Sequence, residues 1–421
     1  MRRLINVQKA AAEALSAVLG GRSLAALPDG LARLEGWERA AFQDATYGAL
    51  RHLGELRACL ALLLRQPLPQ GILECLLIVA LYQLRHTRAA PHAVVDHAVD
   101  CAAAIGSPRA KALVNAVLRN FLRDRDGVVA RARATEEGRF SYPRWWIDRV
   151  RRQYPAEWSA ILEAGNEHPP FTLRVRTSRM SAAGYLERLH ADGIEARQTG
   201  ASAVTLARAL PVADVPGFAA GDVSVQDAGA QLAAPLLDVR EGMGVLDACA
   251  APGGKAAHIL ELARVRLLAL DDDQPRLERV RQNLDRLGLA ADVVHGDATA
   301  PATWWDGAPF DRILADVPCS ASGVVRRHPD VKWLRRPTDV AGFAESQAGL
   351  LDALWQTLCR GGKLLYATCS VFCEENQDQA DRFLSRHRDA RRLPVAGLPD
   401  DGMLLPNRDH DGFFYALFEK D

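Results

Sequence analysis

From about residue 236 onward, short strand-like runs alternate with helix-like runs, and this alternation limits the possible folds more than any other feature. It predicts an α/β domain over residues 236–421, with a mostly parallel sheet covered by helices on both faces. Strands are expected at Gly244 to Ala248, Leu267 to Leu270, Asp292 to His295, Phe310 to Ala315, Gly362 to Ala367 and from Asp411 onward. Helices are expected at Pro275 to Leu287 and Val340 to Cys359.

Residues 1–130 are rich in Ala, Leu and Arg and lack strand-like alternation, so they predict an all-helical domain. In its last helix Lys111, Asn115, Arg119 and Arg123 recur every four residues, opposite an apolar stripe. Residues 1–150 hold 21 Lys and Arg against 14 Asp and Glu, although the whole chain has no net charge. The basic helix face could lie along a phosphate backbone, or it could simply be solvated.

Residues 131–235 form a third region, for which we expect a small α+β connector domain. The segment from Phe140 to Tyr154 indicates an aromatic helix, and FTLRVRTSR from Phe171 alternates as a strand does. Trp145 and Trp146 are interpreted as core anchors rather than as base-stacking platforms.

Several classes of protein are excluded by what the sequence lacks. Apolar runs such as Ala58 to Leu64 are far shorter than the roughly 20 residues of a membrane span. The initial MRRLINVQKA has no apolar core of a secretion signal, so a cytoplasmic location is expected. The eight cysteines include no CxxC pair, so we expect neither disulfides nor a metal site, and most should be buried.

A glycine turn follows the first strand of the α/β domain. Asp247 to Lys255 reads DACAAPGGK, and glycines there let a ligand approach the backbone N–H groups. The pattern is neither a Walker A loop nor a dinucleotide fingerprint. Asp271, at the tip of the second strand, is placed to accept hydrogen bonds from a ribose, and Asp297 after the third could reach an adenine amine.

The series DACAAPGGK, LDDD, GDA, LADVPCSASG and YATCS resembles the RNA cytosine-5 methyltransferase family. PHAVVDHAVDCAAAIG and KALVNAVLRNFLR resemble a NusB-like helical RNA-binding domain, and together the motifs are similar to the bacterial 16S (small-subunit) rRNA branch. The resemblance implies a Rossmann-like class I methyltransferase domain with a seven-stranded sheet, S-adenosylmethionine as cofactor and ribosomal RNA as partner. The cofactor positions that it implies are Cys249, Ala250, Ala251, Pro252, Gly253, Gly254, Lys255, Asp271, Asp297 and Asp316. Asp272 stands where an apolar residue is more usual, so which of Asp271 to Asp273 binds the ribose stays open.

Two cysteines, Cys319 and Cys369, are expected at the ends of neighbouring strands. Carbon 5 of cytosine is a weak nucleophile until a thiolate adds to carbon 6, and a cysteine suits that step. The resemblance assigns Cys369 as nucleophile and Cys319 as an aid to product release. It also places Asp316 near cytosine and cofactor, and Lys255 could stabilise charge there.

A basic, aromatic strip follows the second of these motifs. Between Asp316 and Pro337, five Arg and Lys residues surround His328 and Trp333. Because the strip stands next to the expected active site, Arg326, Arg327 and Lys332 are predicted to contact RNA.

Two alternative functions stay open at this point. A DNA cytosine-5 enzyme would use the cysteine of Pro318-Cys319, although the second cysteine argues against it. A non-enzymatic assembly or antitermination factor would keep the cofactor domain as a scaffold, which the intact motifs disfavour. The protein is expected to be a monomer.

Overall fold

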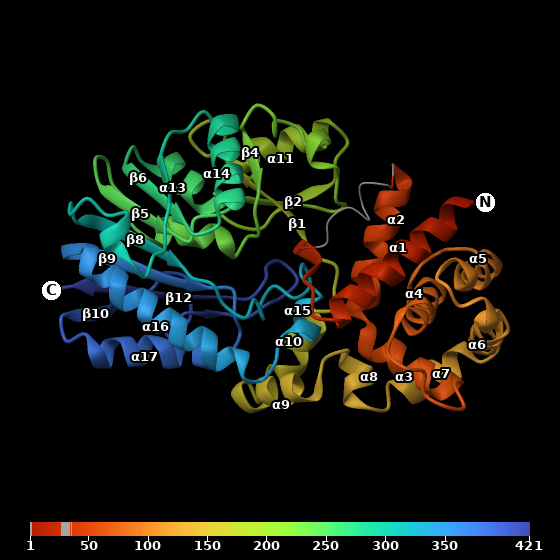
Figure 1. Ribbon diagram of the computed structural model, residues 1–421. Helices are drawn as coiled ribbons and strands as arrows, with labels where there is room; N and C mark the ends of the chain where they lie inside the picture. The colour runs from red at the N-terminus through yellow and green to blue at the C-terminus, as the bar shows by residue number, and fades with distance from the viewer. Residues whose placement is uncertain (1, 27–33, 35) are drawn as a thin grey trace. The chain divides into compact units, whose positions relative to one another are not determined.

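The polypeptide passes three times between two units in the computed structural model, which describes residues 2–26, 34 and 36–421 (Figure 1). The first unit consists of the described residues up to Glu167 together with Val325–Pro337. The second consists of His168–Val324 and Thr338–Asp421. The expected domain boundaries near residues 130 and 235 stay a prediction.

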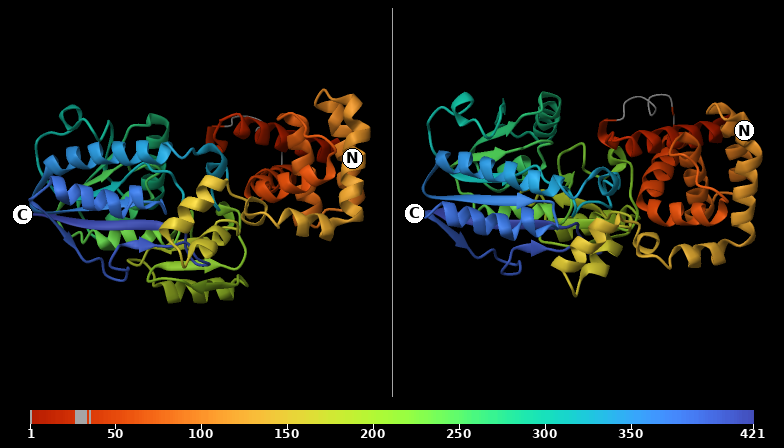
Figure 2. Two further views of the ribbon diagram at one scale, coloured as in Figure 1. Left: turned by 90° about the horizontal axis from the view of Figure 1, so that it is seen from below. Right: turned by 60° about the horizontal axis from the view of Figure 1, so that its bottom comes forward.

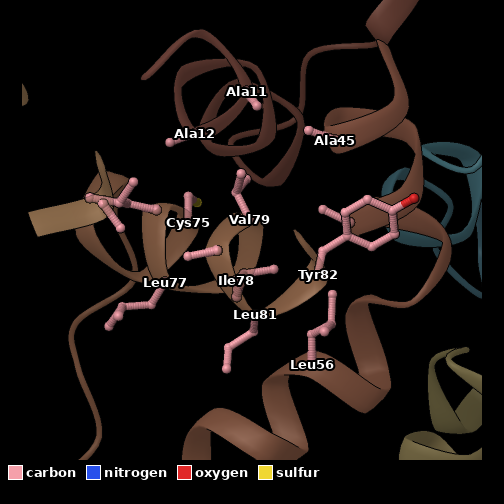
Figure 3. Close-up of a cluster of buried hydrophobic side chains, with 14 of the residues drawn as sticks. Ala11, Ala12, Ala45, Leu56, Cys75, Leu77, Ile78, Val79, Leu81 and Tyr82 are labelled. Carbon is pink, nitrogen blue, oxygen red and sulfur yellow. The ribbon is translucent and has the colours of Figure 1, made fainter. Parts of the chain in front are cut away.

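The first unit is helical, as predicted. Its helices are α1 (Arg2–Leu19), α2 (Trp37–Arg51), α3 (Leu53–Leu63), α4 (Ile72–His86), α5 (Pro91–Ala104), α6 (Lys111–Arg123), α7 (Arg125–Ala132), α8 (Glu136–Phe140), α9 (Arg144–Gln153), α10 (Trp158–Ala164) and α15 (Val331–Leu334). Every residue of α4 from Cys75 to Leu84 is buried. Figure 3 shows side chains of α4 surrounded by residues of α1, α2 and α3. A helix that is apolar on all sides is stable only when other helices enclose it, so α4 forms the centre of this unit.

Helix α15 (Val331–Leu334) belongs to the helical unit although the preceding helix of that unit in the sequence, α10, ends at Ala164. Trp333 packs against the helical core and donates its indole N–H to the Leu50 carbonyl over 2.8 Å. Asp330 accepts hydrogen bonds from the Leu24 N–H at 3.0 Å and the Ser23 hydroxyl at 3.2 Å. The segment from Val325 to Pro337 is therefore an integral part of the helical unit.

The second unit begins with a small antiparallel sheet in the order β2-β3-β1-β4. Its strands are β1 (Phe171–Val175), β2 (Ala196–Gln198), β3 (Ala203–Leu206) and β4 (Val223–Val225), and α11 (Ala182–Ala191) packs on it. The strand expected from Phe171 is confirmed. The other three strands are only three or four residues long, too short for alternation to reveal.

The larger sheet has the order β10-β12-β9-β8-β5-β6-β7, with β11 paired to β12 outside this path. Its strands are β5 (Gly244–Ala248), β6 (Arg266–Asp271), β7 (Asp292–His295), β8 (Phe310–Asp316), β9 (Leu358–Thr368), β10 (Ala390–Leu393), β11 (Met403–Leu404) and β12 (Phe413–Lys420). The five strands from β5 to β9 are parallel to their neighbours, and β12 is antiparallel to β9. The predicted mostly parallel, Rossmann-like sheet of seven strands is confirmed, with β11 as an addition.

Helices cover both faces of this sheet. They are α12 (Ala233–Leu236), α13 (Gly254–Leu262) and α14 (Gln274–Leu287) on one face, and α16 (Asp339–Thr357) and α17 (Gln377–Arg386) on the other. From β5 to β7 the chain moves toward one edge of the sheet, and from β8 to β9 it moves toward the other edge. Because crossovers between parallel strands are right-handed, the helices of the two halves lie on opposite faces. Figure 2 shows α16 and α17 side by side along the sheet.

One expected helix was too long. The prediction from Val340 to Cys359 runs past the end of α16 at Thr357, because Leu358 has an extended backbone and pairs with Phe310 as the first residue of β9.

Within the described part of the chain, no helix combines the length and the apolar character needed to cross a lipid bilayer.

Candidate active site

The turn after β5 has a backbone that requires glycine. Gly253 has φ +94°, and a Cβ added there would lie 3.1 Å from the Val280 Cα. An L-residue at this position would be strained by its backbone and crowded by α14 at once. The Ala251–Pro252 peptide bond is cis. Helix α13 starts at Gly254, so the turn leads directly into a helix N-terminus, as predicted.

Asp271, at the end of β6, fixes this turn. One carboxylate oxygen accepts the Ala251 N–H at 2.9 Å, and the other accepts the Asp273 N–H at 3.1 Å. The Asp273 side chain accepts the Arg276 N–H at 2.9 Å and thereby caps α14. Asp272 lies between them and is exposed. The three adjacent acids thus have different structural roles, two of them committed to backbone hydrogen bonds.

A cavity of about 260 Å³ opens beside the acidic turn. Its polar wall comes from strand ends and includes Asp271, Asp272 and Asp297, while Leu270, Ala298, Pro318, Phe343 and Leu350 contribute apolar surface. Carboxylates can accept hydrogen bonds from ribose hydroxyls and an adenine amine, and apolar walls suit the flat base. The negative charge of the carboxylates also suits a sulfonium cation. The residues present therefore fit S-adenosylmethionine.

The cavity includes some of the expected cofactor residues and omits others. Cys249, Asp271 and Asp297 line it, whereas Asp316 and the turn residues from Ala250 to Lys255 do not. Gln347 and other residues of α16 line it although the sequence did not indicate them. No local sequence signal shows that a helix on one face of the sheet will close a pocket. Acids at strand ends, in contrast, can be recognised from the sequence as candidate ligand-binding residues.

Arg174 is a second residue that the sequence did not single out. This β1 arginine is buried, forms a two-pronged ion pair with Glu261 at 2.9 and 3.0 Å, and donates to the Gly254 carbonyl at 2.7 Å. A buried ion pair holds its shape when both partners are fully hydrogen-bonded. The pair therefore joins the small sheet to the start of α13.

The two cysteines meet at the carboxyl edge of the sheet. β8 and β9 are parallel neighbours, with Asp316 opposite Ala367, so the turns that follow them lie side by side. Cys319 Sγ and Cys369 Sγ are 3.3 Å apart. The hydrogen bond to Cys369 and burial raise the pKa of Cys319 well above that of an ordinary thiol. Cys319 is therefore a protonated thiol that can donate its hydrogen to the Cys369 sulfur.

Charged groups of the glycine turn lie beside these cysteines. Lys255 pairs with Asp316, and although burial disfavours its charge, this pairing and the interaction with Cys369 raise the net pKa of Lys255. The pKa shift therefore favours the charged form of Lys255, near Cys369.

Asp247, at the end of β5, is fully buried, and both its oxygens lack a hydrogen-bond partner among the described residues. Burial and the charge of Asp316 raise the pKa of Asp247 well above the usual Asp value. The neutral, protonated form of this carboxyl is therefore favoured, which reduces the cost of burying it.

Comparisons with known proteins identify the family. Residues 234–419 match the family described as 16S rRNA methyltransferase RsmB/F, residues 142–213 its ferredoxin-like domain, and residues 5–123 the NusB family. Ribosomal RNA small subunit methyltransferase B of Vibrio cholerae is 44% identical over 99% of this chain and 98% of the relative. The chain belongs to the RsmB/F family of 16S rRNA methyltransferases.

A further relative agrees with this assignment, and a solved structure has the same fold. Ribosomal RNA small subunit methyltransferase B of Serratia proteamaculans is 43% identical over 100% of both chains. The crystal structure of PH0851 covers 99% of both chains with a TM-score of 0.80 at 23% identity and has the same fold. Membership makes the chain an S-adenosylmethionine-dependent rRNA methyltransferase with a NusB-like domain, which answers the non-enzymatic alternative.

The structure of this RsmB/F-family enzyme corrects part of the predicted RNA contact. Arg326 and Lys332 are buried in the helical unit, at 1% and 0% exposure. The Lys332 ammonium donates to the Arg51 and Ser141 carbonyls and to the Asn166 side chain, at 2.8 to 2.9 Å. Neither side chain can reach a phosphate, because both are enclosed by protein; the prediction was wrong for these two. Arg327 is half-buried.

We expected most of the cysteines to be buried, and only half of them are. All eight are free thiols, but only Cys59, Cys75, Cys101 and Cys319 are buried. Burial raises the pKa of Cys59 to about 12, so it is unreactive. The described residues contain no cluster of three or more metal-binding side chains.

Proposed function

We propose that this enzyme methylates carbon 5 of a cytosine in 16S rRNA, with Cys369 as nucleophile and Cys319 as an aid to product release. The observation that supports it is the 3.3 Å approach of the two sulfurs at the strand ends, beside Lys255. A single Pro-Cys nucleophile of the DNA type would not need a second cysteine in contact with it.

The first step needs a thiolate at Cys369. The sulfur forms a bond to carbon 6, and the electrons of the carbon 5–carbon 6 double bond make carbon 5 nucleophilic. The Lys255 cation stabilises negative charge on the sulfur before the attack. S-adenosylmethionine supplies the methyl group as a sulfonium electrophile.

Release of the product requires that the bond between the Cys369 sulfur and carbon 6 breaks again. Carbon 5 loses its proton to water, and the bond between carbon 6 and the Cys369 sulfur breaks as the double bond re-forms. Cys319, which is protonated, donates its S–H to the departing Cys369 sulfur and so stabilises the thiolate that leaves. Without Cys319 the covalent RNA adduct should persist.

Covalent trapping tests this mechanism. Wild type, Cys369→Ala and Cys319→Ala are mixed with unmodified 16S rRNA and S-adenosylmethionine and separated on a denaturing gel. We expect an adduct to accumulate in Cys319→Ala, and none in Cys369→Ala. Cys373→Ala, a half-buried cysteine four residues away, is the matched control and should resemble wild type. An adduct that accumulates in Cys369→Ala would exchange the two roles, and no adduct in any protein would refute the covalent mechanism.

The basic face of α6 is proposed to contact the RNA, together with Arg327. Arg119 and Arg123 are exposed on it, and Lys111 retains 43% exposure while paired with Asp100. Each phosphate contact that is lost should reduce the salt dependence of binding by a slope of about 0.9. Arg119→Ala combined with Arg123→Ala should therefore lower the slope by nearly 2. Arg391→Ala, an exposed arginine of β10, is the control, and an unchanged slope in the double variant would refute the contact.

We propose that the enzyme acts as a monomer in the cytoplasm, where ribosomal RNA is found. Light scattering of the purified protein at working concentration tests the first point.

A further inference from the structure

A buried polar cluster ties together the two turns that carry the cysteines. Its members are Ser320, Ser322, Ser370 and Glu375, all of them buried. The three hydroxyl oxygens lie 3.0 to 3.1 Å from one another. Ser320 directly follows Cys319, and Ser370 directly follows Cys369, so the cluster holds the residue next to each reactive sulfur.

Glu375 is the acceptor at the centre of the cluster. One oxygen accepts the Ser320 N–H at 2.7 Å and the Gln347 amide at 3.2 Å. The other accepts the hydroxyls of Ser320 at 2.5 Å and Ser370 at 2.6 Å. Four donors fill the acceptor capacity of one carboxylate, so the ionised form fits this site. Burial raises the pKa of Glu375, and the same hydrogen bonds oppose that rise.

The cluster also reaches the cofactor cavity. Gln347, which lines that cavity, donates to the Pro318 carbonyl at 2.9 Å and accepts the Tyr366 hydroxyl at 3.0 Å. Pro318 directly precedes Cys319. The Cys319 turn is thus held on both sides of the cysteine, through Pro318 and through Ser320.

We propose that Glu375 is a positioning residue that holds the Cys319 turn against the Cys369 turn, so that Cys319 can assist release of the methylated RNA. It touches neither substrate nor cofactor. It acts through Ser320 and Ser370, which directly follow the two cysteines in the chain. A displacement of about 1 Å at either turn would break a 3.3 Å sulfur contact, and losses of that size in catalytic geometry can cost about 100-fold in rate. This inference rests on the proposed covalent mechanism.

The experiment measures turnover and trapped adduct in Glu375 variants of the full-length enzyme. Glu375→Ala leaves four donors without an acceptor, and we expect kcat to fall at least tenfold while the KM for S-adenosylmethionine changes less than threefold. The covalent RNA adduct should accumulate at least tenfold above wild type, although Cys319 is still present. Glu375→Gln is the conservative variant: its amide oxygen can still accept the Ser320 N–H, while its NH₂ donates to the serine hydroxyls. It should recover most of the lost turnover.

A merely structural role predicts a different result. If Glu375 only stabilises the fold, its loss reduces the active fraction, so turnover and adduct fall together. Ser320→Ala removes one hydroxyl and leaves the Ser320 N–H bond in place, so it tests the same point in a protein that should fold. We expect a smaller adduct excess of the same sign. Glu374→Gln makes the same charge change on the neighbouring residue, outside the cluster, and should resemble wild type.

The outcomes separate this inference from the covalent mechanism on which it rests. If Cys319→Ala accumulates no adduct, the covalent mechanism fails, and the inference fails with it. If Cys319→Ala accumulates adduct while Glu375→Ala and Ser320→Ala do not, the mechanism holds and the positioning role of Glu375 is refuted.

Discussion

Replacing Lys332 by methionine should destabilise the helical unit instead of weakening RNA binding. The ammonium is fully buried and donates three hydrogen bonds, to the Arg51 and Ser141 carbonyls and to Asn166. Burial and the charge of Arg51 lower the pKa of Lys332 well below the usual lysine value, so the buried charge is itself costly. Methionine has a similar length and no charge, and it leaves all three acceptors without a donor.

The size of the effect follows from these contacts. A hydrogen bond to a charged group contributes about 1.5–3 kcal/mol, so three contribute roughly 4–9 kcal/mol. Removing the charge relieves a desolvation cost of several kcal/mol. A net loss of about 3 kcal/mol remains. For a unit of about 150–250 residues, each kcal/mol lowers Tm by about 2–4 °C, which gives a fall of roughly 6–12 °C.

Scanning calorimetry of wild type and Lys332→Met measures this shift. Lys9→Met is the control, because the Lys9 side chain is 41% exposed and its pair with Glu13 is a surface ion pair, which contributes at most about 1 kcal/mol. RNA binding at several salt concentrations completes the comparison. If Lys332→Met keeps the wild-type Tm and instead reduces the salt slope by about 0.9, Lys332 contacts phosphate and the structural role assigned to it is wrong.

Three further outcomes follow from the cofactor site and from one buried acid. Gly253→Val should destabilise the enzyme by at least about 1–2 kcal/mol, because Gly253 has a positive φ and lies close to α14. The same substitution should weaken S-adenosylmethionine binding, measured by calorimetry, more than Gly254→Ala does. Asp272→Asn should weaken that binding about tenfold if Asp272 accepts ribose hydroxyls, whereas Asp273→Asn should mainly lower Tm through loss of the helix cap. The pKa of Glu55 in the folded protein is lowered, because its arginine and histidine partners outweigh the effect of burial. As pH falls below about 4.3, the unfolded chain therefore takes up a proton at Glu55 before the folded protein does, and this lowers the stability of the fold. Glu55→Gln removes this effect and should flatten the fall in Tm between about pH 5 and pH 3.

The sequence predicted those parts of the site that depend on strand ends. An apolar run followed by an acid or a cysteine marks where a buried strand reaches the carboxyl edge of the sheet, and adjacent parallel strands then bring such residues together. This reasoning anticipated that Cys319 and Cys369 would be neighbours and that Asp271 and Asp297 would line one cavity. It depends only on local patterns and on the order of the strands.

What the sequence did not predict depends on partners far away in the chain. Charged residues are usually exposed, so nothing local indicated that Lys332 is buried among carbonyls from residues 51 and 141. Glu375 lies outside the cysteine motifs, and its role emerges only when two turns about fifty residues apart meet. The wall of the cavity formed by α16 likewise depends on which face of the sheet that helix covers.

The return of residues 325–337 to the helical unit limits how this protein can be divided. Deleting the first 167 residues would leave a fragment that still carries Trp333, Lys332 and Asp330 but has lost the core and the hydrogen-bond partners of these side chains. The exposed indole and the segment without its partners would favour aggregation over folding. A helical unit from another protein could not simply be fused in front, since its surface would have to accept this segment. Recombination should therefore keep the two units together, and they should be inherited as one piece.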